Sequence, residues 1–342
     1  MNNISKNTNI GRLEDFDIAK GIATFLVVLS HLLEQAFCTW EQVQRVIIFY
    51  HMPVFFFMSG FFLFYSVNKY SKKEILQKKA KQLIIPYICW SFVSLLANII
   101  LAARNESIDN IIVKQFLDIF IYARSLWFLI ALFITQSVFM GLLLLSEYIN
   151  INKYFVLFSG WIIVSLITPS DYFAMYKFKW LFPFLIIGVY YSEHRAQLIA
   201  LRKWTMLSVI FPVLCVLFYN TTYYNAYLFF DYTNLKEIIA GFIYYLFSLL
   251  AITFILSLSA ILCRIKRNAP ILLVSQYSLE IYVCHMFFVK FIVLPTDAIA
   301  NNIILLSVYI ILYTIIILTL IILFCKFLFS RFKIYRFIMG KF

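Results

Sequence analysis

Three histidines within apolar sequence are the residues of this chain best suited to do chemistry. His31 lies near the end of the first apolar run, and Glu34 follows three residues later on the same face of a helix. His51 lies in the second apolar run and His285 in a later one. Ionisable side chains are costly inside a membrane, and an imidazole gains and loses a proton near neutral pH. The pattern predicts acid–base or nucleophilic catalysis, with His31 at its centre and Glu34, His51 and His285 as candidate partners.

These side chains also have structural explanations. A histidine inside a membrane can hydrogen-bond a neighbouring helix and specify its packing, and Glu34 can cap the outer end of its helix instead of orienting His31. The expected depths favour catalysis. At about 1.5 Å per residue, His31 and His285 each lie about 20 Å above the inner end of their segments, and His51 falls at a similar depth. Three of the four histidines of the chain are thus expected in one layer of the membrane.

Transmembrane helices are the elements that must position these residues. Of the 342 residues, 63% are hydrophobic and only 13% are charged, and the mean hydropathy is +0.89. A soluble domain is about half apolar and a quarter charged. Long continuous apolar runs recur along the sequence, so we expect an all-α, polytopic, integral membrane bundle in the cell membrane.

About twenty apolar residues cross a bilayer, and on this criterion we expect about ten transmembrane helices. They cover residues 17–37, 46–65, 83–103, 125–146, 154–168, 180–192, 204–219, 238–262, 271–294 and 303–325. With both termini in the cytoplasm, the inner segments carry 20 lysines and arginines and the outer segments carry 7. This positive-inside bias supports an even number of spans and cytoplasmic termini. It also explains the net charge of +13 without a nucleic-acid partner.

We expect one integral-membrane domain over residues 1–342. Its transmembrane core covers residues 17–329, and cytoplasmic tails cover 1–16 and 330–342. The six cysteines are scattered and form no CxxC pair, which favours a role in helix packing. The sequence contains no P-loop, no HExxH motif and no cluster with metal-ligand spacing, so we predict neither nucleotide hydrolysis nor a metal.

The six lysines between residues 66 and 82 have two explanations. They can act as a topology signal that contacts anionic lipids. They can also bind phosphates, because Lys78 and Lys81 share a face if the third helix begins early, and two cations there would grip a polyphosphate cofactor. Asp17 and Lys20 share a face at the inner end of the first span, which fits an ion pair or a snorkelling lysine as well as a site.

Several residues in or beside the later spans are further candidates. Glu280 lies in the middle of the ninth expected span, where a carboxylate needs a partner such as Arg12, Lys20 or a polar group. Trp127 opens the fourth span and is an interfacial aromatic residue by default. Six aromatic residues in the outer loop at 220–237 are either membrane-belt anchors or a platform that faces a sugar or a lipid.

Five short motifs then occur in the order known from one family of membrane enzymes. They are Asp17-Ile-Ala-Lys20-Gly21 leading to His31, Phe49-Tyr-His51-Met-Pro53 leading to Ser59-Gly60, Leu83-Ile-Ile-Pro86-Tyr87, Leu126-Trp127-Phe128-Leu129, and Ser278-Leu-Glu280-Ile-Tyr282 with His285. Together they resemble the acyltransferase family 3 membrane proteins, most of all the fucose 4-O-acetylase-like branch. Each motif alone is weak, and the ordered set covers nearly the whole chain.

The resemblance implies a ten-helix enzyme with cytoplasmic termini that transfers an acyl group, usually acetyl, from acetyl-CoA to a sugar hydroxyl. The essential histidine of the family corresponds to His31, and the basic residue before it corresponds to Lys20. The paired arginines that the family carries after its second helix have no arginine match here, and Lys78 and Lys81 are the nearest positions. Some relatives carry an additional C-terminal esterase-like domain, which we do not expect in this chain.

The resemblance also suggests roles for residues in or near the matched motifs. We expect the phosphates of acetyl-CoA near five residues: Arg12, Asp17, Lys20, Lys78 and Lys81. Candidates for substrate binding are Trp127, Glu280 and Tyr282.

The prediction from the sequence is therefore a membrane O-acyltransferase of the bacterial cytoplasmic membrane. Its expected partners are acyl-CoA, a glycan or lipid-linked saccharide of the cell envelope, and membrane lipids. His31 acts either as general base or as the transient acceptor of the acyl group. The alternative is a proton-coupled transporter or flippase for a glycan, lipid or small solute. With 8 Gly, 7 Pro and no internal repeat, the chain lacks the broken, repeated helices of many transporters.

Overall fold

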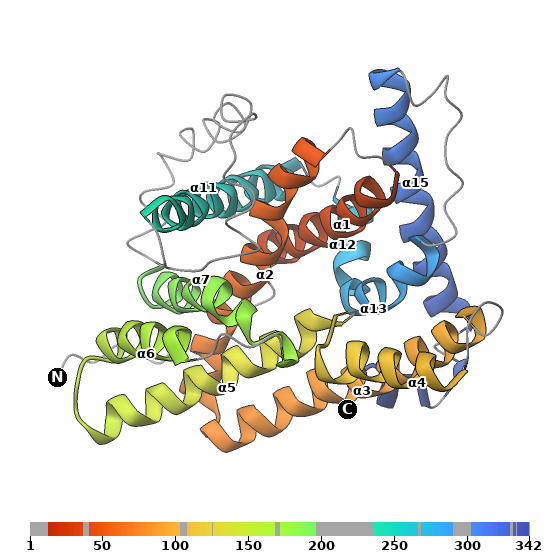
Figure 1. Cartoon of the computed structure of the whole chain (residues 1–342). Coiled ribbons are helices and arrows are strands. Elements are labelled where there is room, and N and C mark those ends of the chain that lie inside the picture. The colour runs from red at the N-terminus through yellow and green to blue at the C-terminus, as the bar shows by residue number, and fades with distance from the viewer. Residues whose placement is uncertain are drawn as a thin grey trace. The chain divides into compact units, whose positions relative to one another are not determined.

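The computed structural model shows a chain built of helices (Figure 1). It describes residues 13–36, 41–102, 108–124, 126–167, 172–195, 235–265, 268–289, 302–328, 331–332 and 334–341, and these contain no β-strand. Two compact units divide the chain. Unit 1 comprises Met1–Met58 and His194–Lys326, and unit 2 comprises Ser59–Glu193 and Phe327–Phe342.

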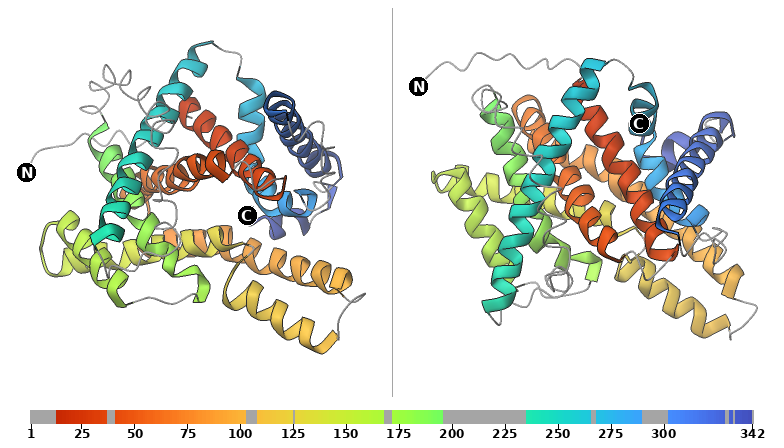
Figure 2. Two further views of the ribbon diagram at one scale, coloured as in Figure 1. Left: turned by 45° about the horizontal axis from the view of Figure 1, so that its top comes forward. Right: turned by 90° about the horizontal axis from the view of Figure 1, so that it is seen from above.

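Helix α1 (Glu14–Ala36) is the centre of unit 1. It packs against α11 (Leu235–Ile265), α12 (Ala269–Gln276), α13 (Ser278–Val289) and α15 (Ile303–Leu323), as Figure 2 shows. Three acidic residues in its first turn complement the partial positive charge of the helix N-terminus. At Gly21 an added Cβ would overlap the backbone of Ile271, so the absent side chain allows α12 to approach α1.

Helix α2 (Glu41–Lys69) passes from unit 1 into unit 2 after Met58. The rest of unit 2 is a further set of helices. They are α3 (Lys72–Ala102), α4 (Ile108–Phe116), the π-helix η2 (Leu117–Ile121), α5 (Trp127–Tyr148), α6 (Lys153–Ile167), the short 3-10 helix η3 (Tyr172–Ala174), α7 (Tyr176–Glu193) and α16 (Ile334–Ile338). Helix α5 contacts α3, α6 and α7, and α16 packs against α3.

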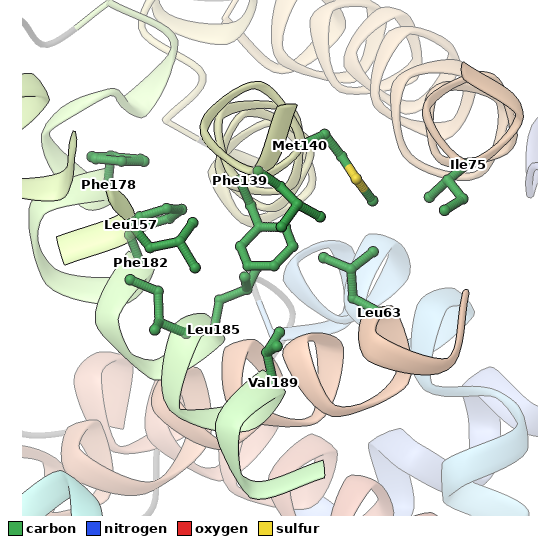
Figure 3. Packing of buried hydrophobic residues seen from close by; sticks show 11 residues of the cluster. Leu63, Ile75, Phe139, Met140, Leu157, Phe178, Phe182, Leu185 and Val189 are labelled. Carbon is green, nitrogen blue, oxygen red and sulfur yellow. The ribbon is translucent and has the colours of Figure 1, made fainter. Parts of the chain in front are cut away.

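The apolar core of unit 2 lies where α5, α6 and α7 meet the end of α2 (Figure 3). Phe139 and Met140 of α5 are buried there beside Phe182 and Leu185 of α7 and Leu63 of α2. Stacking of Phe178 on Phe182, with ring centroids 4.5 Å apart, lines one side of this core. The packed rings and aliphatic chains hold α5 and α7 together in unit 2.

The described helices coincide with nine of the ten expected spans. The expected span at 204–219 lies outside the described residues. Six described helices are long and apolar enough to cross a membrane, or seven if one bent pair forms a single span. The chain is therefore a helical membrane protein, while the count of ten spans and the cytoplasmic termini stay predictions.

The span expected at 271–294 is not one continuous helix in its described part. Two helices, α12 and α13, replace it and meet at an angle of 83°. The polar run from Ser275 to Ser278 interrupts the apolar sequence at this point, and short polar side chains compete with the backbone for hydrogen bonds. As a consequence Glu280 does not lie in the middle of a helix but in the first turn of α13, where the helix dipole favours a carboxylate.

Candidate active site

The best-defined polar centre of unit 1 begins with His31 and Glu34 on α1. The two residues are three apart, so they lie on one face of the helix, and His31 Nδ1 is 3.1 Å from Glu34 Oε2. The side chain of His31 is 32% exposed and that of Glu34 is 59% exposed. Because the carboxylate accepts a hydrogen bond from Nδ1, the other ring nitrogen of His31, Nε2, carries the lone pair in the neutral imidazole. This is the arrangement that a general base requires.

His285 on α13 supplies the second imidazole of the centre. It is only 2% exposed, and its Nδ1 lies 3.0 Å from the carbonyl oxygen of Ile281 and 2.7 Å from that of Tyr282. A nitrogen that faces two carbonyl oxygens must carry the hydrogen, so Nδ1–H donates and Nε2 holds the lone pair. That Nε2 atom is buried without a hydrogen-bond partner among the described residues.

The rings of His31 and His285 lie side by side, with centroids 5.1 Å apart and planes inclined by 38°. The two residues are far apart in sequence and meet because α1 packs against α13. Each imidazole has its Nδ1 engaged and its Nε2 available, so the pair offers two proton-accepting nitrogens in one place. Such a pair can take a proton from one hydroxyl and accept a hydrogen bond from another.

The other candidates of unit 1 are distributed around α1, α2 and α13. His51 is 7% exposed on α2, and Glu280 is fully buried on α13. The ring of Tyr282 lies 6.0 Å from that of His285, measured between centroids. Asp17 and Lys20 are on α1 as expected, in its first and second turns. Arg12 lies outside the described residues, so its expected role stays a prediction.

The remaining candidates belong to unit 2. Helix α3 begins at Lys72, which is early enough to place Lys78 and Lys81 on one helix with both side chains exposed. The Lys78 ammonium lies 5.7 Å from the centroid of the Tyr70 ring. Trp127 is the first residue of α5. The described residues contain no group of three or more His, Cys, Asp or Glu side chains that could hold a metal ion.

Sequence reasoning treated Lys177 only as a charge in an outer loop, and the structure gives it another place. Its side chain is 7% exposed, and its ammonium lies 4.8 Å from the ring centroids of both Trp127 and Tyr176. Such cation–π contacts stabilise a cation that is removed from water. The neighbouring aromatic residues in the sequence were a signal for this contact, but no sequence pattern pairs Lys177 with Trp127, which lies fifty positions earlier.

Residues 13–326 match the acyltransferase domain family, which is the acyltransferase 3 family. The chain is also similar to the nodulation protein NolL of Sinorhizobium fredii (strain NBRC 101917 / NGR234), with 23% identity over 241 residues. That match covers 66% of this chain and 64% of the relative, so less than two thirds of the relative's length is spanned. No solved structure matches the chain.

Proposed function

The chain belongs to the acyltransferase 3 family, and from this premise we propose that it moves an acetyl group from cytoplasmic acetyl-CoA to a sugar hydroxyl of a cell-envelope or exported glycan. The observation that carries the proposal is the contact of His31 with Glu34 and His285 in unit 1. The fucose 4-O-acetylase-like branch, the acetyl donor and the sugar acceptor belong to the proposal as well. We also place the protein in a bacterial cytoplasmic membrane with several spans.

His31 is the general base of the proposed reaction. Its Nε2 takes the proton of the sugar hydroxyl while the hydroxyl oxygen attacks the thioester carbonyl. The C–S bond breaks, the C–O bond of the new ester forms, and the departing thiolate of CoA receives the proton from His31. Glu34 holds the ring in the required tautomer and stabilises the imidazolium, as the acidic member of a catalytic triad does.

An acyl-imidazole is the alternative form of the same proposal. In that case Nε2 of His31 attacks the thioester carbonyl first, the C–S bond breaks and CoA leaves as a thiolate. The sugar hydroxyl oxygen then attacks the acetyl group, the bond between the acetyl carbon and the ring nitrogen breaks, and the hydroxyl proton passes by way of Nε2 of His285 to neutralise the thiolate. His285 can assist both routes through the lone pair at its Nε2. In the acyl-imidazole route this lone pair takes up the proton of the attacking hydroxyl, and in the general-base route it holds a second hydroxyl group of the sugar as a hydrogen-bond acceptor. The position of His285 beside His31 supports this holding role.

Cationic residues near helix ends are the proposed binding site of the acyl donor, acetyl-CoA. Arg12, Lys20, Lys78 and Lys81 are the proposed contacts of the CoA phosphates, and Asp17 orients Lys20. Exposure of Lys78 and Lys81 on α3 supports their availability to a polyphosphate. Trp127, Glu280 and Tyr282 stay proposed contacts of the substrates.

Thioester cleavage by the purified protein in lipid nanodiscs tests this function. We expect the wild type to release free CoA from acetyl-CoA when an envelope glycan is present, and His31→Ala to lower the rate about 10²- to 10⁴-fold. Glu34→Gln should fall between the two, since the amide still accepts a hydrogen bond from Nδ1 but carries no charge.

His194→Ala is the matched control, because it removes the fourth histidine of the chain, which has no proposed role. Its rate should equal that of the wild type. A folded His31→Ala protein that releases CoA at the wild-type rate would contradict the mechanism. Absence of both acetyl-CoA binding and cleavage, across a panel of glycans, would instead favour a proton-coupled transporter.

A further inference from the structure

Two junctions between helices of unit 2 have unusual backbone dihedral angles. The first is at residues 122–124 between η2 and α5, and the second is at η3, just before α7. Three of the four described non-glycine residues with positive φ lie there: Ala123 (53°), Phe173 (51°) and Ala174 (54°). Left-handed backbone is strained for a non-glycine residue, because its Cβ crowds the following carbonyl oxygen. Strain of this kind persists only where the surrounding structure holds it, and it gathers at functional sites.

Buried contacts hold the strained junctions in place. Ala123 and Ala174 are 0% and 1% exposed, so one left-handed residue of each junction is buried in the core. On the neighbouring helix α3, the Tyr87 hydroxyl donates to the carbonyl oxygens of Ile119 (3.0 Å) and Phe120 (3.1 Å) in η2. A π-helix frees carbonyl groups of this kind, and π-helical turns are frequent at functional sites.

The two junctions bring a group of polar and aromatic side chains together at the surface. We call Asp118, Tyr122, Arg124 and Tyr172 the tyrosine platform. The rings of Tyr122 and Tyr172 are stacked, with centroids 5.7 Å apart and planes within 14°. Arg124 lies 5.3 Å from the centroid of the Tyr122 ring and forms an ion pair with Asp118, Nη1 to Oδ1, at 3.3 Å. The Arg124 side chain is 69% exposed and Tyr172 is 54% exposed.

The chemistry of the tyrosine platform fits a sugar ring. The C–H face of a pyranose is apolar and packs on an aromatic face, while its rim carries hydroxyl groups that need donors and acceptors. Tyr172 offers an exposed ring, and the planar carboxylate and guanidinium of Asp118 and Arg124 offer charged acceptors and donors beside Tyr122, on which Tyr172 is stacked. An aromatic anchor at the membrane interface requires neither a strained backbone nor this ion pair.

We propose that the tyrosine platform binds a saccharide of the acceptor, with one sugar ring stacked on Tyr172 and hydroxyl groups of the same saccharide bonded to Asp118 and Arg124 beside Tyr122. The proposal rests on the proposed function in that the acceptor is a glycan. It adds a binding site in unit 2 to the imidazole pair in unit 1. The stacked partner Tyr122 makes the platform rigid, so little conformational entropy is lost when the sugar binds.

Saturation-transfer NMR on the full-length protein in phosphatidylcholine nanodiscs tests the platform without any catalysis. The probes are the methyl glycosides of fucose, galactose, glucose and N-acetylglucosamine, each without acetyl-CoA. We expect the ring C–H signals of at least one glycoside to receive saturation from the wild type. Tyr172→Ala should weaken its binding about tenfold, because the stacking surface is lost. Tyr172→Phe should bind like the wild type, since the ring remains.

Tyr148→Ala is the matched control, because Tyr148 is 89% exposed at the other end of α5. Its binding should be unchanged. Thermal unfolding of each variant shows whether it is folded, and if Tyr172→Ala is not, the surface variants Arg124→Gln and Asp118→Asn take its place with weakened binding expected. Equal saturation in the wild type and these variants, or no binding of any glycoside, would overturn the platform.

Different results would contradict the acyltransferase reaction and the tyrosine platform. His31→Ala should lose thioester cleavage and keep glycoside binding. Cleavage of acetyl-CoA by a protein that binds no glycoside would overturn the platform and leave the acyltransferase proposal standing. Glycoside binding that Tyr172→Ala abolishes, in a protein that never cleaves acetyl-CoA, would support the platform and contradict the proposed reaction.

Discussion

At the scale of single residues, the hydrogen bonds that Nδ1–H donates decide what the two imidazoles can do. His31 uses Nδ1 toward Glu34, and His285 uses Nδ1 toward two carbonyl oxygens of its own helix. Both rings therefore present Nε2 as a proton acceptor. The residue types and the spacing of His31 and Glu34 could be read from the sequence, because both lie within one turn of one helix. The tautomer of His285 could not, since it depends on the rotamer that the buried ring adopts.

His285→Phe tests whether the second imidazole takes part in the reaction. Phenylalanine fills the space of the buried ring, and the backbone carbonyls at Ile281 and Tyr282 keep their helical hydrogen bonds, so we expect a folded protein with near-normal thermal stability. Without the lone pair at Nε2, kcat for acetyl transfer should fall at least about tenfold. Unchanged kcat in the folded variant would show that His285 only packs against His31.

At the scale of elements, glycines set how closely the helices approach. The family motif Ser59-Gly60 lies in α2 at a point where an added Cβ would overlap the backbone of Leu185 in α7. The side-chain amide of Gln136 in α5 donates a hydrogen bond to the hydroxyl of the neighbouring Ser59. A small residue and a polar contact thus join three helices at one place, which is a common way to hold helices together in a membrane. Small residues such as these are typical of a close helix contact, but the sequence does not identify the partner helix.

Gly60→Ala and Gly141→Ala form a matched pair for this contact. At Gly60 the new methyl group meets backbone atoms, which cannot rotate away, so we expect a loss of about 1–3 kcal/mol in stability. At Gly141 in α5 nothing lies within 4 Å of an added Cβ, and alanine should be neutral or stabilise the helix by up to about 1 kcal/mol. Thermal unfolding in detergent measures both. Equal melting temperatures for the two variants would contradict the tight contact.

At the scale of the whole molecule, charge distribution and hydropathy set the membrane topology. The family match covers residues 13–326 and therefore runs through both units, and one integral-membrane domain over residues 1–342 stays a prediction. The bent pair α12 and α13 affects the span count, because it is either a broken span or a re-entrant pair. The lysine and arginine bias of 20 to 7 is obtained only if this region crosses the membrane once.

Reporter fusions test this topology in cells. A fluorescent protein fused after the C-terminal residue should be bright, and alkaline phosphatase at the same position should be inactive, because cytoplasmic termini follow from the charge bias. Fusions at Lys153 and at Arg264 should behave in the same way, since both lie in expected inner segments. Active alkaline phosphatase at the C-terminus, together with inactive enzyme after Lys6, would show an odd number of spans.

The sequence by itself determined the membrane class, the place of most helices, the catalytic candidates on α1 and the family. The first three follow from composition, periodicity and local spacing, and the family follows from the resemblance of five motifs in their order. None of these depends on distant contacts. Only the tertiary structure decided the bend before α13, the meeting of His31 with His285, and the burial of Lys177 against Trp127. It also assembled the tyrosine platform from two segments fifty residues apart. Such features arise from packing between helices, which the linear order of residues does not specify.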